Sequence, residues 1–560
     1  MSESIRETLA FLYGETKADD IARAVEQLIG QFRARITPPA PADARPTGRD
    51  TILITYGDQV RRDGEPPLRT LADFLSTHVC GAITAVHILP FYPSSSDDGF
   101  SVMDYFAVDP ALGSWADVER LGGSFDLMFD AVFNHASAQG VWFKNFLEQK
   151  PGWETAFVTV DGDPDLSQVV RPRALPLLTE FEVKGGSRRV WTTFSADQVD
   201  INFADPRMLL RILEALLFYV EKGARYIRLD AIAFLWKEVG TPCIHLPQTH
   251  AAIELMRRVL DEVAPAVQLI TETNVPHQDN ISYFGNGTNE AQMVYNFALP
   301  PLVFHTLRTG DATALQRWAR TLELPSNKVT FFNFLASHDG IGLNPARGLL
   351  EPAEIDALVE TALAHQGFVS YKSLPDGSKA PYELNVNYFD ALNNPLESTA
   401  STLDTEVARF LAAHAIMLAM RGVPGIYFHS LFGSRGDRAG AETSGIPRRI
   451  NRQKFDVTTL TAELAISGGR REKVFRGMCE MLAARASHPA FDPFAPQEIL
   501  ESGSGTIAIL RGVKKRVLAV VNVTATPQPE NIPSECRGWR PLLGEPGQTL
   551  PPYGVLWLAE

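Results

Sequence analysis

The sequence has few cysteines and no apolar run long enough to cross a membrane. Its four cysteines lie far apart in 560 residues and lack the spacing of paired zinc ligands: Cys80, Cys243, Cys479 and Cys536. A zinc knuckle and a dense disulfide framework are therefore not expected, and reduced thiols fit best. The first 15 residues carry acids among their apolar positions, unlike a secretory signal. These features predict a cytoplasmic protein that does not insert into a membrane.

Positive charge is also scarce. The chain has 52 Lys and Arg against 66 Asp and Glu, a formal net charge of −14. A nucleic-acid or anionic-membrane partner would need a basic surface, so neither is expected. There is no glycine-rich nucleotide fingerprint and no P-loop, and we expect no cofactor and no bound metal. The remaining expectation is a small-molecule substrate, bound by a monomer or a homodimer.

Apolar periodicity divides the chain into segments. Residues 1–47 place apolar side chains at helical spacing before a Pro-rich stretch, which predicts a helical N-terminal extension and linker. Residues 491–560 alternate in polarity and predict a C-terminal β-domain. Two long intervals show little periodicity and are expected to be irregular lids or binding loops. The predicted segments between the ends are a first barrel part (48–135), an inserted domain B (136–205) and a second barrel part (206–490) with a loop insertion at about 340–405.

Eight short apolar runs separated by helical stretches predict an α/β fold, a (β/α)₈ TIM barrel. The runs lie at residues 51–58, 85–92, 125–135, 226–231, 268–274, 293–300, 329–339 and 424–430. Most of them end in polar residues. Because the chemistry of such barrels lies at the carboxyl-terminal ends of the strands, these polar ends are where we expect the site.

Two carboxylates follow neighbouring runs, Asp230 after the fourth and Glu272 after the fifth. Arg228, two residues before Asp230, would point to the same face and keep that carboxylate ionised. Taken singly, each would more often be a structural residue in a salt bridge. Together they fit the carboxyl pair that retaining chemistry at a glycosidic bond requires, with Asp230 as nucleophile and Glu272 as general acid/base.

Four motifs in this order resemble those of the α-amylase superfamily. They occupy residues 130–135, 228–230, 272 and 337–339. The resemblance implies that Asp339 is a third catalytic carboxylate that braces the sugar hydroxyls. It also implies that Arg228 binds near the substrate, and that His135 and His338 donate hydrogen bonds that strengthen as charge develops in the transition state.

Residues 50 to 490 more closely resemble the sucrose phosphorylase group, through motifs at 54–56, 86–91, 97–100, 294–301 and 339–342. This resemblance implies a set of substrate-binding residues: Asp97 and Arg448 on the glucosyl hydroxyls, Phe100 and Phe194 as an apolar platform, and Gln198, Tyr382 and Glu383 around them. It also implies that phosphate is held by Tyr382 and by Arg171 or Arg173, a choice that the spacing leaves open. Any one of these residues could equally be core or surface filler.

The acceptor side departs from the sucrose phosphorylases. Asn274 stands two residues beyond Glu272, where those enzymes usually have a His, which puts fructose in doubt. The loop 370–379 is more basic than theirs, and Glu383 replaces a Gln. Lys372, Lys379 and the pair Arg448 and Arg449 predict a cationic rim for a negatively charged acceptor, although solvated lysines would explain the loop as well. The pattern most resembles the α-glucosylglycerate phosphorylases.

The resulting expectation is a retaining glycoside phosphorylase. It would transfer an α-glucosyl unit from 2-O-α-D-glucosyl-D-glycerate to inorganic phosphate and release α-D-glucose 1-phosphate. Sucrose, sucrose 6-phosphate and glucosylglycerol remain alternative substrates, and an α-glucosidase-type hydrolase is an alternative activity. A catalytically inactive binding protein is disfavoured because every catalytic residue type is present.

Overall fold

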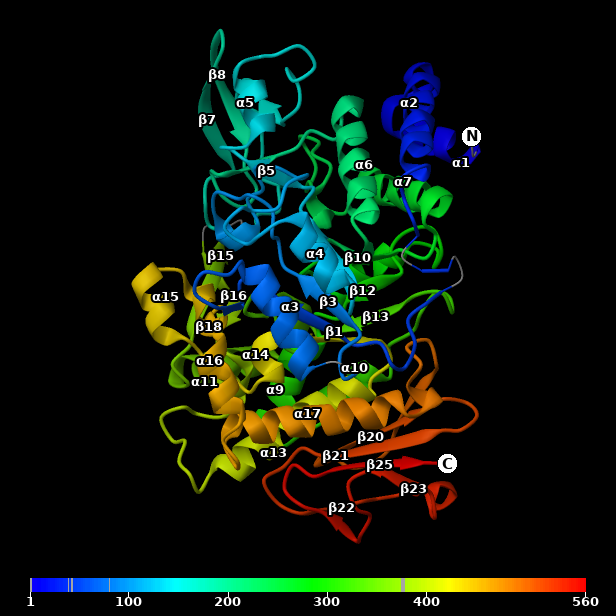
Figure 1. Ribbon diagram of the computed structural model, residues 1–560, viewed down its shortest axis with the longest axis vertical. Coiled ribbons are helices and arrows are strands. Elements are labelled where there is room, and N and C mark those ends of the chain that lie inside the picture. Colours follow the sequence, from blue (N-terminus) through cyan, green and yellow to red (C-terminus); the bar gives the residue numbers. More distant parts are fainter. Residues whose placement is uncertain (1–2, 39, 42–43, 80, 374–377) are drawn as a thin grey trace.

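The computed structural model describes residues 3–38, 40–41, 44–79, 81–373 and 378–560 (Figure 1). Cys80 and residues 374–377 of the basic loop lie outside this part. Eight parallel strands close into a barrel in the order β1, β17, β13, β12, β11, β10, β4, β3, which confirms the predicted fold. Their bounds are Ile52–Thr55 (β1), Ala85–Ile88 (β3), Asp126–Ala131 (β4), Ala224–Leu229 (β10), Gln268–Thr271 (β11), Met293–Tyr295 (β12), Thr330–Asn333 (β13) and Val423–Tyr427 (β17).

Helices connect the barrel strands along its outside. Helix α6 shows why they form: Asp205 caps it by accepting from the Arg207 N–H, Pro206 occupies its first turn, and its apolar residues recur on one buried face. The main helices are α3 (Pro67–His78), α4 (Trp115–Gly122), α6 (Pro206–Glu221), α7 (Pro247–Val263), α9 (Leu299–Thr309), α13 (Leu403–Ala419) and α17 (Arg470–Ala486).

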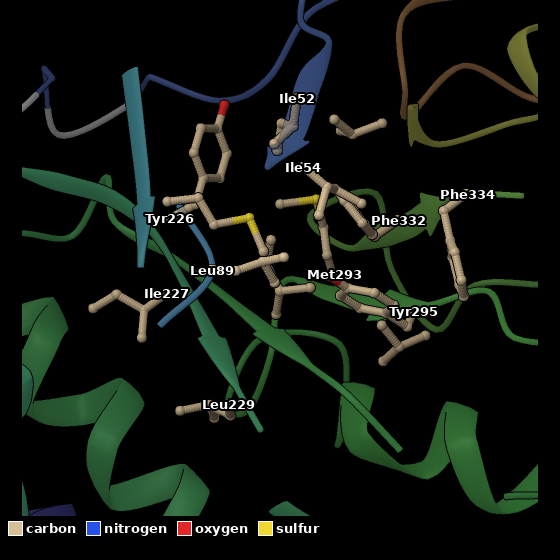
Figure 2. Close-up of a cluster of buried hydrophobic side chains, with 14 of the residues drawn as sticks. Ile52, Ile54, Leu89, Tyr226, Ile227, Leu229, Met293, Tyr295, Phe332 and Phe334 are labelled. Atoms are coloured by element: carbon tan, nitrogen blue, oxygen red, sulfur yellow. The ribbon is translucent and has the colours of Figure 1, made fainter. Parts of the chain in front are cut away.

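The barrel interior has an apolar layer followed by a polar layer. Figure 2 shows the apolar side chains that meet inside it, among them Ile52, Ile54, Met293 and Phe332. Ile227 and Leu229 point away from this group because successive side chains of a strand face opposite sides. Further along the strands the buried side chains are polar: His87, Asp130 and Arg228. Since buried charges must be paired, this layer requires a hydrogen-bonded network at the barrel mouth.

Both long insertions contain regular structure, so the expectation of irregular loops is wrong. The first holds β5 (His135–Ser137), α5 (Val141–Leu147), β6 (Thr159–Val160), β7 (Leu178–Val183), β8 (Gly186–Trp191) and β9 (Gln198–Asp200). The second holds β14 (Ile341–Gly342), α11 (Pro352–Ala364), β15 (Phe368–Ser373), β16 (Lys379–Asn385) and α12 (Tyr388–Leu392). These strands are stabilised by pairing with one another, as in the sheet β14-β16-β15, and local sequence pattern does not show such pairing.

The two ends of the chain pack on different parts of the barrel. Helices α1 (Glu3–Tyr13) and α2 (Glu15–Arg33) lie against α6 and α7 (Figure 1, blue). A five-stranded antiparallel sheet lies at the opposite end, beyond α17: β19 (Gln497–Leu500), β20 (Thr506–Arg511), β21 (Val517–Asn522), β25 (Val555–Ala559) and β23 (Arg540–Leu543). The domain boundaries themselves stay predictions. No helix among the described residues combines the length and apolarity needed to span a bilayer.

Candidate active site

A cavity of about 540 Å³ opens where the barrel strands end and the two insertions meet. Most of the predicted site residues line it: Asp97, Phe100, His135, Arg171, Arg173, Phe194, Gln198, Asp230, Glu272, His338, Asp339, Tyr382 and Arg448. Arg228 and Glu383 do not line it. Each is 2% exposed and contacts a lining residue from behind. The structure therefore gathers the whole predicted set around one space.

Arg228 organises the two predicted catalytic carboxyl groups. Its Nη1 lies 2.7 Å from Asp230 Oδ1, and its Nη2 lies 3.8 Å from Glu272 Oε2. The backbone N–H of Ala231 also donates to Glu272, at 3.0 Å. Asp130 holds the same guanidinium from inside the barrel. The cation is thus nearer to Asp230 than to Glu272.

This asymmetry suits a nucleophile and an acid. Burial, helped by the neighbouring charges of Asp230 and Asp339, raises the pKa of Glu272 to about 7. Burial also raises the pKa of Asp230, but the Arg228 guanidinium opposes that rise. Two carboxyl groups held in different electrostatic surroundings can divide the roles of proton donor and anion at neutral pH.

Asp339 belongs to a second ion-pair network. Arg448 bridges it, with Nη1 at 2.7 Å from Asp339 Oδ1 and two further bonds to Glu383, at 2.9 and 2.6 Å. Burial opposes the charge on Asp339, yet Arg448 and Arg452 hold its pKa well below the usual range. Burial lowers the pKa of His338 to about 3, so its ring is neutral. Asp339 is therefore an anion fixed beside a neutral imidazole.

Asp97 is presented by a turn with unusual backbone angles. Asp97 and Asp98 have φ values of +52° and +48°, and Gly99 has φ +112°. A Cβ at Gly99 would lie 2.6 Å from the carbonyl oxygen of Pro90, so only glycine fits. Left-handed angles at two consecutive non-glycine residues store strain, which the surrounding structure must offset. Here Asp98 pairs with cations while Asp97 faces the cavity.

Aromatic rings form the wall of the cavity beside His135 and His338. Phe100 stacks on His338 with ring centroids 4.7 Å apart and an interplanar angle of 5°. Phe194 contacts His135 at 5.3 Å and Phe234 at 5.6 Å. The carbonyl oxygen of Phe100 lies 3.0 Å from Nε2 of Gln198, which donates to it. These contacts fix the ring faces that the sequence resemblance implies as a platform for a sugar ring.

Sequence reasoning missed a buried lysine that joins three segments. Lys237 Nζ lies 2.5 Å from Asp200 Oδ2 and 2.7 Å from Asn134 Oδ1, and it also donates to the carbonyl of Phe234. Its side chain is 2% exposed. Burial lowers the pKa of Lys237, and Asp200 opposes this. The ammonium thereby ties the first insertion and the end of β4 to the segment after β10.

The part of the cavity that the two insertions line has a different charge pattern. Lys372 Nζ donates to Asn344 Oδ1 at 2.9 Å, and no carboxylate pairs with it in the described part of the chain. Burial, followed by the nearby Arg347, lowers the pKa of Lys372. Arg173 has no hydrogen-bond or ion-pair partner among the described residues, and its charge acts on Tyr382. Arg171 instead bonds the carbonyl of Leu175 in its own loop.

Only part of the predicted cationic rim lines the cavity. Lys372 and Arg448 do, but Arg448 is neutralised by its two carboxylates. Arg449 pairs with Asp98 at 2.7 Å, and Lys379 is exposed at the start of β16. The expected rim of four cations is thus reduced to one unneutralised lysine, together with Arg171 and Arg173.

Asn274 also lines this side. Its Oδ1 is buried and has no hydrogen-bond partner within the described residues. A Cβ at Gly342, in β14, would come within 2.8 Å of the Asn274 amide, so a larger residue there would displace that side chain. An unpaired buried acceptor in a cavity wall is a position where a ligand hydroxyl can donate.

The described residues contain no group of three or more His, Cys, Asp or Glu side chains arranged to hold a metal ion. The three cysteines in the described part are free. The absence of a metal from the mechanism stays a prediction.

Comparison with known proteins matches residues 81–341 to the α-amylase catalytic domain. The chain is 52% identical to a glucosylglycerate phosphorylase of Allomeiothermus silvanus, over 94% of each chain. It is 48% identical to a glucosylglycerate phosphorylase of Spirochaeta thermophila, over 98% of this chain and 95% of that one. The crystal structure of sucrose 6F-phosphate phosphorylase from Thermoanaerobacter thermosaccharolyticum superposes with a TM-score of 0.74 at 23% identity, covering 86% of this chain and 95% of that one, and supports the fold.

Proposed function

Since this chain belongs to the α-amylase family, in its branch of glycoside phosphorylases, we propose that it is a glucosylglycerate phosphorylase acting through a covalent glucosyl-enzyme. The observation that carries the proposal is the division of one cavity into two sides. One side has paired carboxylates, and the other has cations that no carboxylate of the described residues neutralises. The first side suits a glucosyl unit, and the second suits phosphate and an acidic acceptor.

In the first step Glu272 gives its proton to the glycosidic oxygen while an Asp230 oxygen attacks the anomeric carbon. Glycerate leaves as a free hydroxy acid, and the glucosyl unit remains bonded to Asp230. The pKa of about 7 supports Glu272 as the donor, and the 2.7 Å ion pair with Arg228 supports Asp230 as the anion.

In the second step a phosphate oxygen attacks the same carbon from the face that glycerate left. Glu272, now a carboxylate, accepts the phosphate proton, the bond to Asp230 breaks, and α-D-glucose 1-phosphate is released. Two inversions restore the original configuration. Arg173 and Tyr382 are the proposed phosphate ligands. Arg173 is unpaired among the described residues, and it lies close enough to Tyr382 for its positive charge to lower the pKa of that hydroxyl, against the larger effect of burial. Arg171 instead bonds a carbonyl of its own loop.

Lys372 is the proposed partner of the glycerate carboxylate. Its Nζ is oriented by Asn344 and partly desolvated, which strengthens its attraction to an anion. A charge-assisted hydrogen bond contributes about 1.5 to 3 kcal/mol, or roughly ten- to hundredfold in preference over a neutral acceptor. Asn274 supplies an acceptor for a glycerate hydroxyl.

The proposal is tested in the synthetic direction. Purified enzyme is incubated with α-D-glucose 1-phosphate and, separately, with D-glycerate, glycerol, fructose or fructose 6-phosphate, and released phosphate is measured. We expect glycerate to be the fastest acceptor. Faster release with fructose, its phosphate or glycerol would identify a different phosphorylase, and release without any acceptor would indicate a hydrolase.

A cytoplasmic location, and a monomer or homodimer without nucleic-acid or membrane partners, are part of the same proposal. The net charge of −14 supports the absence of polyanionic partners. Glucose 1-phosphate and inorganic phosphate are both charged, so an enzyme that uses them is best placed where they are retained.

A further inference from the structure

The N-terminal helices form an outer layer on the barrel that the proposed reaction does not use. Their apolar faces are buried and continuous with the main core, with relative exposures of 8% or less for Ile5, Leu9, Leu12, Ile21, Val25, Ile29 and Phe32. They pack on α6 and α7, the helices before and after β10 (Figure 1). Strand β10 leads directly to Asp230.

Tyr13, at the end of α1, reaches the segments that build the cavity. Its hydroxyl donates to the carbonyl of Phe203 at 2.8 Å, and its ring lies 6.3 Å from that of Trp236. Phe203 follows β9, which carries Gln198 to the cavity. Trp236 stands between Phe234, which lines the cavity, and Lys237, whose ammonium bonds Asp200 and Asn134.

The other end of the extension is fastened to the same two helices. Arg33 bonds the carbonyl of Glu262 at 2.7 Å and its carboxylate at 2.9 Å, at the end of α7. Arg35 pairs with Glu221, the last residue of α6, at 3.2 Å. Because these pairs are largely exposed, each contributes little by itself. They add to the buried apolar contacts that hold the extension against α6 and α7.

We propose that the N-terminal helices position the acceptor wall of the cavity, residues 231–237, and that Tyr13 is the positioning residue that transmits this through Trp236 and Phe203. The wall comes directly after Asp230, and Ala231, Ala233 and Phe234 line the cavity. It lies beside the acceptor because the Ala231 N–H bonds Glu272, which acts on the acceptor oxygen in the proposed reaction. A wall displaced by a fraction of an ångström weakens acceptor binding, while the ion pairs of Asp230 with Arg228 and of Asp339 with Arg448 keep their geometry. The acceptor named in the test rests on the proposed function.

The experiment compares Tyr13→Ala, Tyr13→Phe and the matched control Phe11→Ala in the full-length enzyme. Phe11 lies on the same helix but is 58% exposed. We expect Tyr13→Ala to raise the KM for D-glycerate by about fivefold, the effect of roughly one hydrogen bond, with a smaller rise for Tyr13→Phe. Hydrolysis of α-D-glucosyl fluoride without acceptor, which reports the glucosyl side alone, should keep its kcat. Phe11→Ala should match the wild type in both assays.

Two outcomes would overturn the inference. One is an unchanged KM for glycerate in Tyr13→Ala with only a lower melting temperature, which would make the residue purely structural. The other is an equal fall of both activities, which would mean that the whole site is disturbed. If the wild type does not glucosylate glycerate, the proposed function fails instead, and the same variants are compared with whichever acceptor the wild type uses.

Discussion

The two sides of the cavity handle charge in opposite ways. On the glucosyl side two acids have a cation in close contact, Asp230 with Arg228 and Asp339 with Arg448. On the acceptor side Lys372 and Arg173 have no carboxylate partner among the described residues. Paired groups are fixed in advance for a neutral sugar that becomes cationic in the transition state. Unpaired cations leave room for anions to complete the site.

The two sides also differ in where they come from. Asp230 and Glu272 follow barrel strands directly, and their backbone is held by the closed sheet. Lys372 and Tyr382 come from a three-stranded sheet in the second insertion. A rigid scaffold for the common chemistry and added segments for the acceptor allow one barrel to serve different acceptors.

The glucosyl side is broken most severely by Asp230→Asn. The amide cannot form the glucosyl ester, and we expect kcat for phosphorolysis to fall by at least about 10⁴-fold. The exposed Asp163→Asn is the control and should retain full activity. Phosphorolysis by Asp230→Asn within tenfold of the wild type would disprove the assignment of the nucleophile.

The attachment of the first insertion to the segment after β10 is broken by Lys237→Met. Asp200 is fully buried, and removing its cation leaves an unpaired charge, which destabilises a protein by about 3 to 5 kcal/mol. Urea unfolding should therefore show a large loss for Lys237→Met and almost none for the exposed Lys184→Met. Equal stability of the two variants would show that Lys237 does not hold the insertion in place.

The acceptor side is tested by Lys372→Ala against Lys379→Ala, two lysines on paired strands of the same sheet. We expect Lys372→Ala to lower kcat/KM for glucosylglycerate roughly ten- to hundredfold while that for glucosylglycerol changes little. Lys379→Ala should leave both values unchanged because its side chain does not line the cavity. If both substrates lose equally in Lys372→Ala, the lysine does not recognise the carboxylate.

The protonation of Glu272 on the glucosyl side should have a smaller effect, which is measured as the pH dependence of kcat/KM. Because the pKa of Glu272 is raised from 4.5 to about 7, its acid form is lost as the pH rises through 7. The value of kcat/KM for glucosylglycerate should then fall about tenfold per pH unit above that point. By the same linkage, the contribution of Glu272 to stability declines as the pH rises from 4.5 to about 7.

Glucosyl fluoride is the control for this profile, since its leaving group needs no proton. The rate at which glucosyl fluoride glucosylates the enzyme should therefore not decline above pH 7. A decline shared by both substrates would place the titration on another group.

The sequence was informative where local pattern and function coincide. The strands that end before Asp230 and Glu272 could be predicted from the sequence, because alternating polarity and strand length are local properties of the chain. The contact between Lys237 and Asp200 is not, since the two residues are distant in the chain and meet only in the folded structure. The same holds for Arg449, whose charge is cancelled by Asp98 from another segment. Charge counting along a sequence cannot show which cations are already neutralised.

The most direct test of the account is phosphate-dependent cleavage measured by release of α-D-glucose 1-phosphate. Glucosylglycerate, glucosylglycerol, sucrose and sucrose 6-phosphate are compared at equal phosphate, with phosphate-free reactions as controls. The account predicts that glucosylglycerate is cleaved fastest, roughly ten- to hundredfold faster than glucosylglycerol, and only slowly without phosphate. Faster release from sucrose, or equal cleavage with and without phosphate, would contradict it.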